Sequence, residues 1–249
     1  MKKLVVIVFL VVSGFVSGQS VTGTSGLIHI PSARMLEDGQ LVIGAAYIPK
    51  PYFTYVNRGG YLGGQLRNNP GLNTYITYQI LPFAEIMFRY THELNMPVTV
   101  ENKYFPDRML SARIRVLNEK KKIPSLVFGF HDLGAIIIPF DRRVSGMFEG
   151  SINNNFSSSY MVISKLFRKS FLEFDLSVGY GSDFFKIGTS SFNGIFGGLQ
   201  INALKFSLII EYDSQYFHTG IKWRQLNSIN LMFGLWDLNK PTFSFNYLF

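Results

Sequence analysis

Ten charged side chains of this sequence occupy positions from which several could act together. Each lies in a segment where apolar and polar residues alternate, and we interpret all ten as lying on one face. Successive side chains of a strand point to opposite sides, so residues of one parity share a face. Six are basic and four are acidic: Glu85, Arg89, Arg113, Arg115, Lys165, Glu173, Asp175, Glu211, Lys222 and Arg224.

Acid–base catalysis is the first chemistry that this set suggests, because Glu173 and Asp175 are neighbouring carboxylates. Paired carboxylates can serve as general acid and base. However, the two lie on one predicted strand beside expected Arg and Lys partners, which lower carboxyl pKa values and disfavour an acid role. We therefore interpret the ten residues as a salt-bridge network that fills a narrow interior enclosed by the strands. We predict no catalytic residue.

Metal, cofactor and nucleophile chemistry have weaker support. The four histidines, His29, His92, His131 and His218, show no ligand spacing, and the chain has no cysteine. A structural zinc site or a bound cofactor is therefore not expected. The sequence has no Gly-x-Ser-x-Gly elbow and no phosphate-binding loop. A Ser–His–Asn site of the kind found in outer-membrane phospholipases must face lipid. His218 instead has the parity of the ten charged residues, which we interpret as the inward face, and this argues against such a site.

The C-terminal residues 241–249 show most clearly what kind of element carries these side chains. Four aromatics, Phe243, Phe245, Tyr247 and Phe249, alternate with Thr242, Ser244, Asn246 and Leu248. In water, such an aromatic terminal strand would be an aggregation hazard. In a bilayer, the same alternation suits a barrel strand with lipid outside and a polar lumen inside. A terminal strand that ends in Phe also resembles the signal that outer-membrane assembly machinery reads.

Alternating segments of this kind recur along the chain and predict twelve strands. They cover residues 41–47, 72–80, 85–91, 109–117, 125–131, 158–167, 171–180, 192–200, 205–213, 216–224, 229–236 and 242–249. Connections after even-numbered strands are short, and most of those after odd-numbered strands are longer. Bacterial barrels are built with short periplasmic turns and longer external loops. The pattern predicts an all-β, transmembrane, antiparallel up-and-down β-barrel over residues 41–249, with both ends in the periplasm.

The first 18 residues have the features of a secretory signal peptide. Lys2 and Lys3 precede an apolar run that ends before Ser17 and Gly18, which predicts cleavage before Gln19. The run of about 13 residues is too short to cross ~30 Å of hydrocarbon as a helix. Without cysteine, neither disulfides nor an N-terminal lipid tether is expected. We predict Sec export to the outer membrane of a Gram-negative bacterium.

Composition agrees with this class of protein. The chain has 24 Phe and 13 Tyr beside two Trp, and only 16% of its residues are charged. Removing Lys2 and Lys3 takes the net charge from +8 to +6, which is 22 basic minus 16 acidic residues. For an exported barrel, this balance favours membrane lipid, anionic lipopolysaccharide or an acidic polysaccharide as partners. Nucleic acid is not expected, because no basic cluster is organised around a reading module.

Residues 19–40 form an N-terminal segment that does not extend the alternation of the barrel. They contain Pro31 followed by Ser-Ala-Arg-Met, and a turn signal at Glu37-Asp38-Gly39. A barrel of about twelve strands is wide enough to hold a short segment, where Arg34 could pair with Glu173 or Glu211. A periplasmic leader or docking strand is equally compatible with the sequence. The position of this segment, and whether the lumen is open, therefore stay undecided.

Several stretches of the chain are similar to a known family. The stretch GLIHIPSARMLEDGQLVIG (residues 26–44) resembles the opening of YjbH-like outer-membrane proteins, which are associated with exopolysaccharide biosynthesis and export. Further matches are YQILPFAEIMFRYT (78–91), IPSLVFGFHDLGA (123–135), SSSYMVISKLF (157–167) and FDLSVGYG (174–181). Typical members are several times longer, and the family's charged DKSFD-type loop and glycine-rich GTG are absent. The resemblance implies a pathway and a membrane but no catalytic residue.

The resulting hypothesis is a non-enzymatic outer-membrane barrel that serves secretion or surface attachment of exopolysaccharide, together with periplasmic export proteins. Two alternatives stay open. One is a small-solute porin, and the other is a lipid-modifying barrel enzyme. Open-channel conductance would indicate the first, and release of fatty acids from vesicles would indicate the second.

Overall fold

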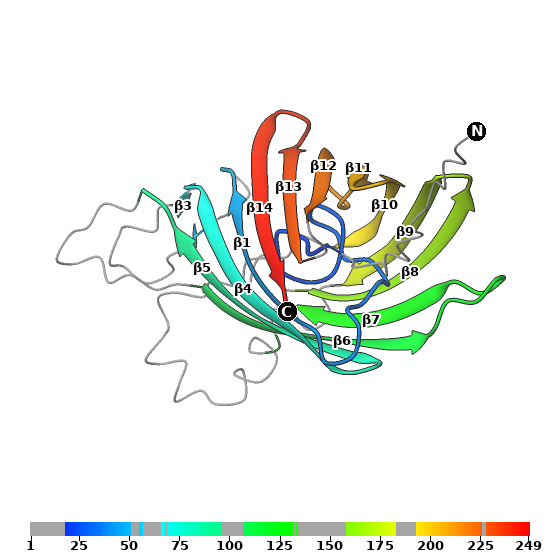
Figure 1. Cartoon of the computed structure of the whole chain (residues 1–249). Helices are drawn as coiled ribbons and strands as arrows, with labels where there is room; N and C mark the ends of the chain where they lie inside the picture. Colours follow the sequence, from blue (N-terminus) through cyan, green and yellow to red (C-terminus); the bar gives the residue numbers. More distant parts are fainter. Residues whose placement is uncertain are drawn as a thin grey trace, which may run out of the picture.

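The computed structural model describes residues 18–50, 55–56, 66–67, 69–95, 107–131, 133, 158–182, 193–225 and 228–249. In this part of the chain, twelve strands form one closed antiparallel barrel (Figure 1). The barrel strands are β1 (Leu41–Ile48), β4 (Gly71–Leu81), β5 (Ala84–Glu93), β6 (Asp107–Leu117), β7 (Ser125–His131), β8 (Ser158–Lys169), β9 (Leu172–Ser182), β10 (Gly194–Ala203), β11 (Phe206–Tyr212), β12 (Phe217–Gln225), β13 (Ile229–Trp236) and β14 (Lys240–Leu248). The predicted fold class is confirmed, whereas the signal-peptide residues 1–17 lie outside the described residues.

Each strand pairs with its neighbour in the sequence, and β1 closes the barrel by pairing with both β14 and β4. The closed ladder satisfies backbone hydrogen bonds without a free edge, as a structure of strands in lipid requires. The connection between β1 and β4 contains two short strands that the alternation did not predict, β2 (Tyr55–Val56) and β3 (Leu66–Arg67). They pair with each other in antiparallel orientation. No helix in the described part of the chain is long and apolar enough to cross a membrane.

Side chains on the two faces of the wall differ as the alternation predicts. On β14, Phe243, Phe245 and Tyr247 are exposed, while Thr242 and Ser244 are buried inside. The same alternation recurs on the other strands, so that most exposed large side chains are apolar. An apolar exterior of this kind is what a bilayer requires of a barrel.

The connections after β4, β6, β8, β10 and β12 all lie at one end of the barrel, which we call the short-turn end, whereas the short connections after β11 and β13 lie at the other end. Three of them are two-residue turns, between the pairs Leu81–Ala84, Lys169–Leu172 and Ala203–Phe206. Ser170 and Leu204 adopt the positive φ that tight hairpin turns need. The first and last strands also meet there, where the Phe249 N–H donates to the Leu41 carbonyl oxygen at 2.8 Å. The predicted parity of the connections is therefore present.

The N-terminal residues 18–36 lie inside the barrel, as the blue segment of Figure 1 shows, and we call them the luminal segment. Its chain has no regular strand, but two isolated bridges fold it back on itself, Gln19 with Ser25 and Gly26 with Pro31. Nearly all of its side chains are buried, and the chain becomes exposed only at residues 37–39, before β1. Of the two positions that the sequence left open, the structure places the segment in the lumen.

Candidate functional site

The candidate site is the surface between the barrel wall and the luminal segment. Inward-facing glycines provide room for its apolar side chains. A Cβ atom on Gly198 would lie 2.6 Å from Leu27 Cδ2, and one on Gly220 would lie 3.0 Å from Ile28 Cδ1. A Cβ atom on Gly234 would lie 3.5 Å from Ile28 Cγ2. Glycine at these positions therefore forms the recess in which Leu27 and Ile28 pack.

Glu211, on β11, binds the backbone of the segment just beyond this recess. Its two carboxylate oxygens accept hydrogen bonds from the Ile28 N–H at 2.8 Å and the His29 N–H at 2.7 Å. All three residues are buried. A buried carboxylate needs such donors, because leaving it without partners would cost roughly 1–3 kcal/mol or more. Glu211 and the turn of the luminal segment thus stabilise each other.

Glu85 and Arg113, on β5 and β6, bind the opposite side of the segment. Arg113 donates to the carbonyl oxygens of Ser25, Ser32 at 2.8 Å and Arg34 at 2.6 Å. Glu85 accepts a 2.7 Å hydrogen bond from the Ser25 hydroxyl and lies 3.5 Å from Arg113 Nε. The two wall residues form an ion pair and at the same time satisfy backbone groups that make no regular secondary structure.

Further polar side chains of the wall bind carbonyl oxygens of the segment. Lys222 Nζ, on β12, donates to Gly26 at 2.6 Å and lies 3.4 Å from the Gly18 carbonyl oxygen. Asn73 Nδ2, on β4, donates to the Val21 carbonyl oxygen at 2.8 Å. Backbone polar groups buried away from water are nearly always paired, and here the wall supplies their partners.

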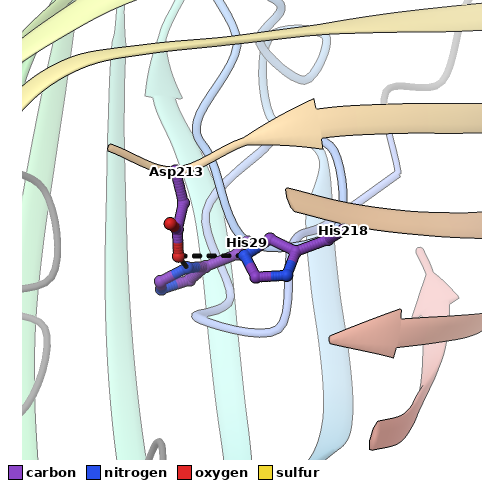
Figure 2. Close-up of side chains that lie close together, drawn as sticks. All are labelled: His29, Asp213 and His218. Atoms are coloured by element: carbon purple, nitrogen blue, oxygen red, sulfur yellow. Dashed lines mark hydrogen bonds and ion pairs between the residues drawn. The ribbon is translucent and has the colours of Figure 1, made fainter. Parts of the chain in front are cut away.

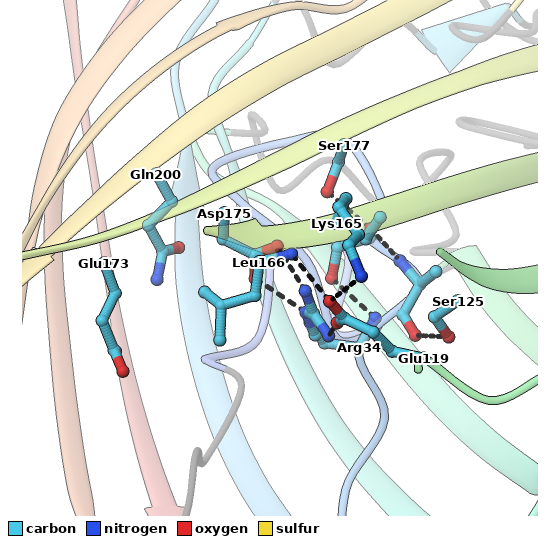
Figure 3. A network of polar contacts seen from close by, with 12 residues as sticks. Arg34, Glu119, Ser125, Lys165, Leu166, Glu173, Asp175, Ser177 and Gln200 are labelled. Atoms are coloured by element: carbon cyan, nitrogen blue, oxygen red, sulfur yellow. Dashed lines mark hydrogen bonds and ion pairs between the residues drawn. The ribbon is translucent and has the colours of Figure 1, made fainter. Parts of the chain in front are cut away.

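Arg34 connects the segment to two carboxylates near the short-turn end (Figure 3). It makes a bidentate pair with Asp175 of β9, with Nε–Oδ2 at 2.8 Å and Nη2–Oδ1 at 2.7 Å. Its Nη1 also donates to Glu119, in the connection between β6 and β7. Glu119 in turn lies 3.1 Å from Lys165 Nζ and accepts the Leu166 N–H at 3.0 Å. Bidentate arginine–carboxylate pairs combine energy with a fixed geometry.

The expected partners of Arg34 were wrong. Glu173 instead lies 2.9 Å from Arg168 Nε, and Glu211 binds backbone N–H groups.

For Glu119, burial raises the pKa of the carboxyl, but hydrogen bonds from Arg34, Leu166 and Lys165 outweigh burial and lower the pKa below its ordinary value. Glu119 is therefore a carboxylate at neutral pH.

A cluster of two histidines and one aspartate holds the segment at the end of β11 that lies away from the short-turn end (Figure 2). Asp213 Oδ2 lies 2.8 Å from His29 Nδ1 and 2.9 Å from His218 Nε2. The Trp236 ring packs against both imidazoles, with centroids 4.4 Å from His29 and 4.9 Å from His218. Burial raises the pKa of the Asp213 carboxyl, but hydrogen bonds from His218 and His29 outweigh burial and bring the pKa well below its ordinary value.

The ligand atoms of this cluster lie within 4.8 Å of one another, close enough to consider a metal ion. The hydrogen bonds favour a different interpretation. His218 Nδ1 accepts the Asp237 N–H at 3.0 Å, so the ring proton of a neutral His218 is on Nε2. A protonated Nε2 can donate to Asp213 but cannot ligate a metal. We therefore interpret the cluster as a hydrogen-bonded clasp. Ligand spacing in the sequence could not reveal it, because His29 comes from the irregular luminal segment.

The ten predicted lumen residues do not all occupy equivalent positions. Six are buried inside the barrel: Glu85, Arg89, Arg113, Asp175, Glu211 and Lys222. Arg115, Glu173 and Arg224 are partly exposed and lie toward the short-turn end. Rather than pairing mainly with one another across the lumen, Glu211, Lys222 and Asp175 bind the luminal segment.

Lys165 does not have the inward position that we predicted. On β8, Ser164 is buried while Met161 and Ile163 are exposed, so Lys165 has the parity of the exposed residues. It lies at the end of the strand, where Nζ donates to the Lys120 carbonyl oxygen at 2.5 Å. The strand continues to Lys169, beyond the region where the alternation separates inside from outside.

Comparison with known proteins matches the sequence of this chain to a protein family. The family model described as YjbH, exopolysaccharide biosynthesis protein YbjH, matches residues 18–235. Among curated proteins, none matches the chain.

Solved structures to which the chain is similar include an outer membrane channel, an attachment invasion locus protein and an outer membrane secretin. An outer membrane channel from Pseudomonas putida has 11% identity and a TM-score of 0.41, covering 87% of this chain and 97% of that one. The attachment invasion locus protein Ail of Yersinia pestis has 10% identity and a TM-score of 0.19, with coverages of 85% and 99%. A bacterial polysaccharide outer membrane secretin has 10% identity and a TM-score of 0.28, with coverages of 86% and 98%. At TM-scores this low, none of the three carries an argument about function.

Proposed function

The chain belongs to the YjbH family of exopolysaccharide biosynthesis proteins, and from that membership we propose a non-enzymatic outer-membrane barrel that serves secretion or surface attachment of exopolysaccharide. The observation that carries the proposal is the luminal segment, which buried wall residues hold at both ends of the lumen. A barrel filled in this way suits a regulated or scaffolding role better than constant passage of small solutes.

The site supports a non-enzymatic role. Its buried carboxylates already have partners, since Glu211 binds two N–H groups and Asp175 binds Arg34. The His29–Asp213 contact could in principle form part of a catalytic triad. An enzyme acting on membrane lipid would need that contact to face the bilayer, whereas both side chains are buried in the lumen.

The proposed setting is the outer membrane of a Gram-negative bacterium, reached by Sec export, with the short-turn end in the periplasm. The apolar exterior would contact lipid and lipopolysaccharide. The proposed partners in the pathway are an anionic polysaccharide, attracted by the net positive charge, and periplasmic export proteins near residues 37–39, where the chain leaves the lumen.

Polysaccharide measurements in cells test the proposal. A strain that lacks this chain should lose surface-bound or secreted exopolysaccharide, and the wild-type chain should restore it. Complementation with a Leu176→Arg chain should fail and serves as the control, because we expect an arginine on the apolar exterior to impair assembly. Normal polymer in the deletion strain would refute the proposal. Steady conductance of the purified wild-type barrel would favour a porin, and fatty-acid release from lipid vesicles would favour a lipid-modifying enzyme.

A further inference from the structure

Gln19 occupies an unusual place in the lumen for a residue that we expect to become the first of the exported chain. It is fully buried, and neither its side-chain Nε2 nor its Oε1 has a hydrogen-bond partner. Buried carboxamides are nearly always hydrogen-bonded, and each exception calls for an explanation. The expected cleavage before Gln19 suggests one.

The residue that cleavage would remove makes specific contacts. The Gly18 carbonyl oxygen accepts the Gly26 N–H at 3.1 Å and lies 3.4 Å from Lys222 Nζ. The Gly26 bond belongs to the bridge between Gln19 and Ser25 that folds the segment. After cleavage, the Gly26 N–H would lose its acceptor.

Cleavage would also create a new positive charge. A free α-ammonium group on Gln19 would lie in the lumen near the buried ammonium of Lys222, since the Gly18 carbonyl oxygen, two bonds from the Gln19 nitrogen, lies 3.4 Å from Lys222 Nζ. The carboxylate on the neighbouring strand, Glu211, already binds the Ile28 and His29 N–H groups. Two adjacent buried cations are unfavourable, because the low-dielectric interior strengthens their repulsion.

We propose that Gln19 is converted to an N-terminal pyroglutamate. The unprotonated α-amino nitrogen attacks side-chain Cδ and forms an N–Cδ bond. The Cδ–Nε2 bond breaks, and Nε2 leaves as ammonia with a proton from the α-amine. The step is redox-neutral and needs no co-reactant. Because the folded lumen buries Gln19, cyclisation precedes insertion of the segment, while the exported chain is unfolded.

The product resolves each problem of the free N-terminus. The lactam nitrogen is neutral, so Lys222 has no neighbouring cation. The lactam carbonyl is bonded to the Gln19 nitrogen, as the Gly18 carbonyl was before cleavage. Its oxygen supplies an acceptor in that region for the Gly26 N–H or Lys222 Nζ. The side-chain Nε2, which has no partner in the lumen, is lost as ammonia.

Mass spectrometry of the folded protein tests the proposal directly. The full chain is expressed in a Gram-negative bacterium, purified from outer membranes and unfolded, and free amines are dimethylated before trypsin digestion. Trypsin releases residues 19–34, because Arg34 is the first lysine or arginine after Gln19. We expect this peptide to be undimethylated and lighter by one ammonia. A dimethylated Gln19, or an N-terminus at any other residue, would overturn the proposal.

A conservative variant tests the physical reason. Gln19→Asn keeps a carboxamide but would have to form a strained four-membered lactam, so its α-ammonium stays free. We expect its heat-induced shift in gel mobility to occur at a lower temperature than that of the wild type. The loss should be smaller in a Lys222→Met background, which removes the neighbouring cation. An equal loss in both backgrounds would refute the charge argument.

Discussion

Arg34 reaches from the luminal segment to two carboxylates on different parts of the wall, Asp175 in β9 and Glu119 before β7. Its side chain is 20% exposed, so the pairs are partly screened by solvent. Even so, removing the guanidinium leaves Asp175 without its cation and Glu119 with Lys165 alone, and such losses exceed the value of the pair itself. Arg34 is therefore the residue at which a single substitution should loosen the segment.

Arg34→Gln should destabilise the luminal segment by about 1–3 kcal/mol, less than a fully buried pair would lose, because solvent partly screens the carboxylates. The measurement is the rate at which protease cleaves the segment in folded, detergent-solubilised barrel. Arg168→Gln is the matched control, since the Arg168–Glu173 pair has a 63% exposed arginine and exposed pairs contribute only about 0–1 kcal/mol. Equal cleavage rates in the two variants would contradict the anchoring role of Arg34.

Glu119 gives the Arg34 anchor a dependence on pH. The folded-state pKa of this carboxyl is lowered, so its stabilising effect is present above the unfolded pKa of about 4.3 and is lost as pH falls through the lower folded pKa. Protease cleavage of the segment should therefore accelerate in acid, below about pH 4. In Glu119→Gln, the segment should be cleaved faster at neutral pH, and cleavage should accelerate less in acid. If cleavage accelerates in acid as much in Glu119→Gln as in the wild type, groups other than Glu119 cause the pH dependence.

For single residues, the alternation of the strands predicted most inward positions but not the partners of these side chains. The parity of Glu211 and Lys222 was readable, because alternation depends only on the strand to which they belong. Their contacts with Ile28 and Gly26 depend on how an irregular segment folds in the lumen, and irregular backbone has no period to detect. His29 and Asp213 were missed as a pair for the same reason.

Strands, the elements of this fold, were predictable because lipid outside and polar contacts inside impose a period of two on every segment. The predicted strands 125–131 and 229–236 coincide with β7 and β13. Strand ends were less predictable, because beyond the hydrocarbon region both faces meet water. Lys165, at the end of β8, shows this limit.

Leu176 and Ser177, adjacent on β9, test the assignment of the two faces. Leu176 is 43% exposed on the lipid side, so Leu176→Arg should cost roughly 2–4 kcal/mol near the membrane midplane and impair assembly. The measurement is the fraction of heat-modifiable barrel in outer membranes. Leu176→Phe, which stays apolar, should assemble normally. Equal assembly of the Arg and Phe variants would show that this face does not meet lipid.

Ser177, the inward-facing neighbour of Leu176, lies where the interior is already filled. The side chain is fully buried and its hydroxyl lies 2.7 Å from that of Ser164, which itself binds the Ala33 N–H at 2.7 Å. An arginine there has no room while the luminal segment is in place. Ser177→Arg should therefore assemble poorly or expel the segment, although it faces the lumen.

At the scale of the whole molecule, a closed wall and a folded segment form one structure with two separable parts. The wall has its own complete hydrogen-bonded ladder and apolar exterior, neither of which includes residues 18–36. The segment has little regular structure and depends on the wall for its partners. Removing it should leave a barrel whose lumen contains charged side chains that water can hydrate.

Deleting residues 22–37 tests this separation. A twelve-stranded barrel lies between the ~8 strands that side chains can fill and the ~16 that leave an open channel. Planar bilayers should show little current with the wild type and steady current with the deletion variant, because the segment fills the lumen between the Arg34 anchor and the His29 clasp. Arg168→Gln should behave like the wild type and controls for protein handling. Polysaccharide export in cells is measured in parallel. Unchanged conductance together with lost export would contradict a plug and assign the segment to docking of periplasmic partners.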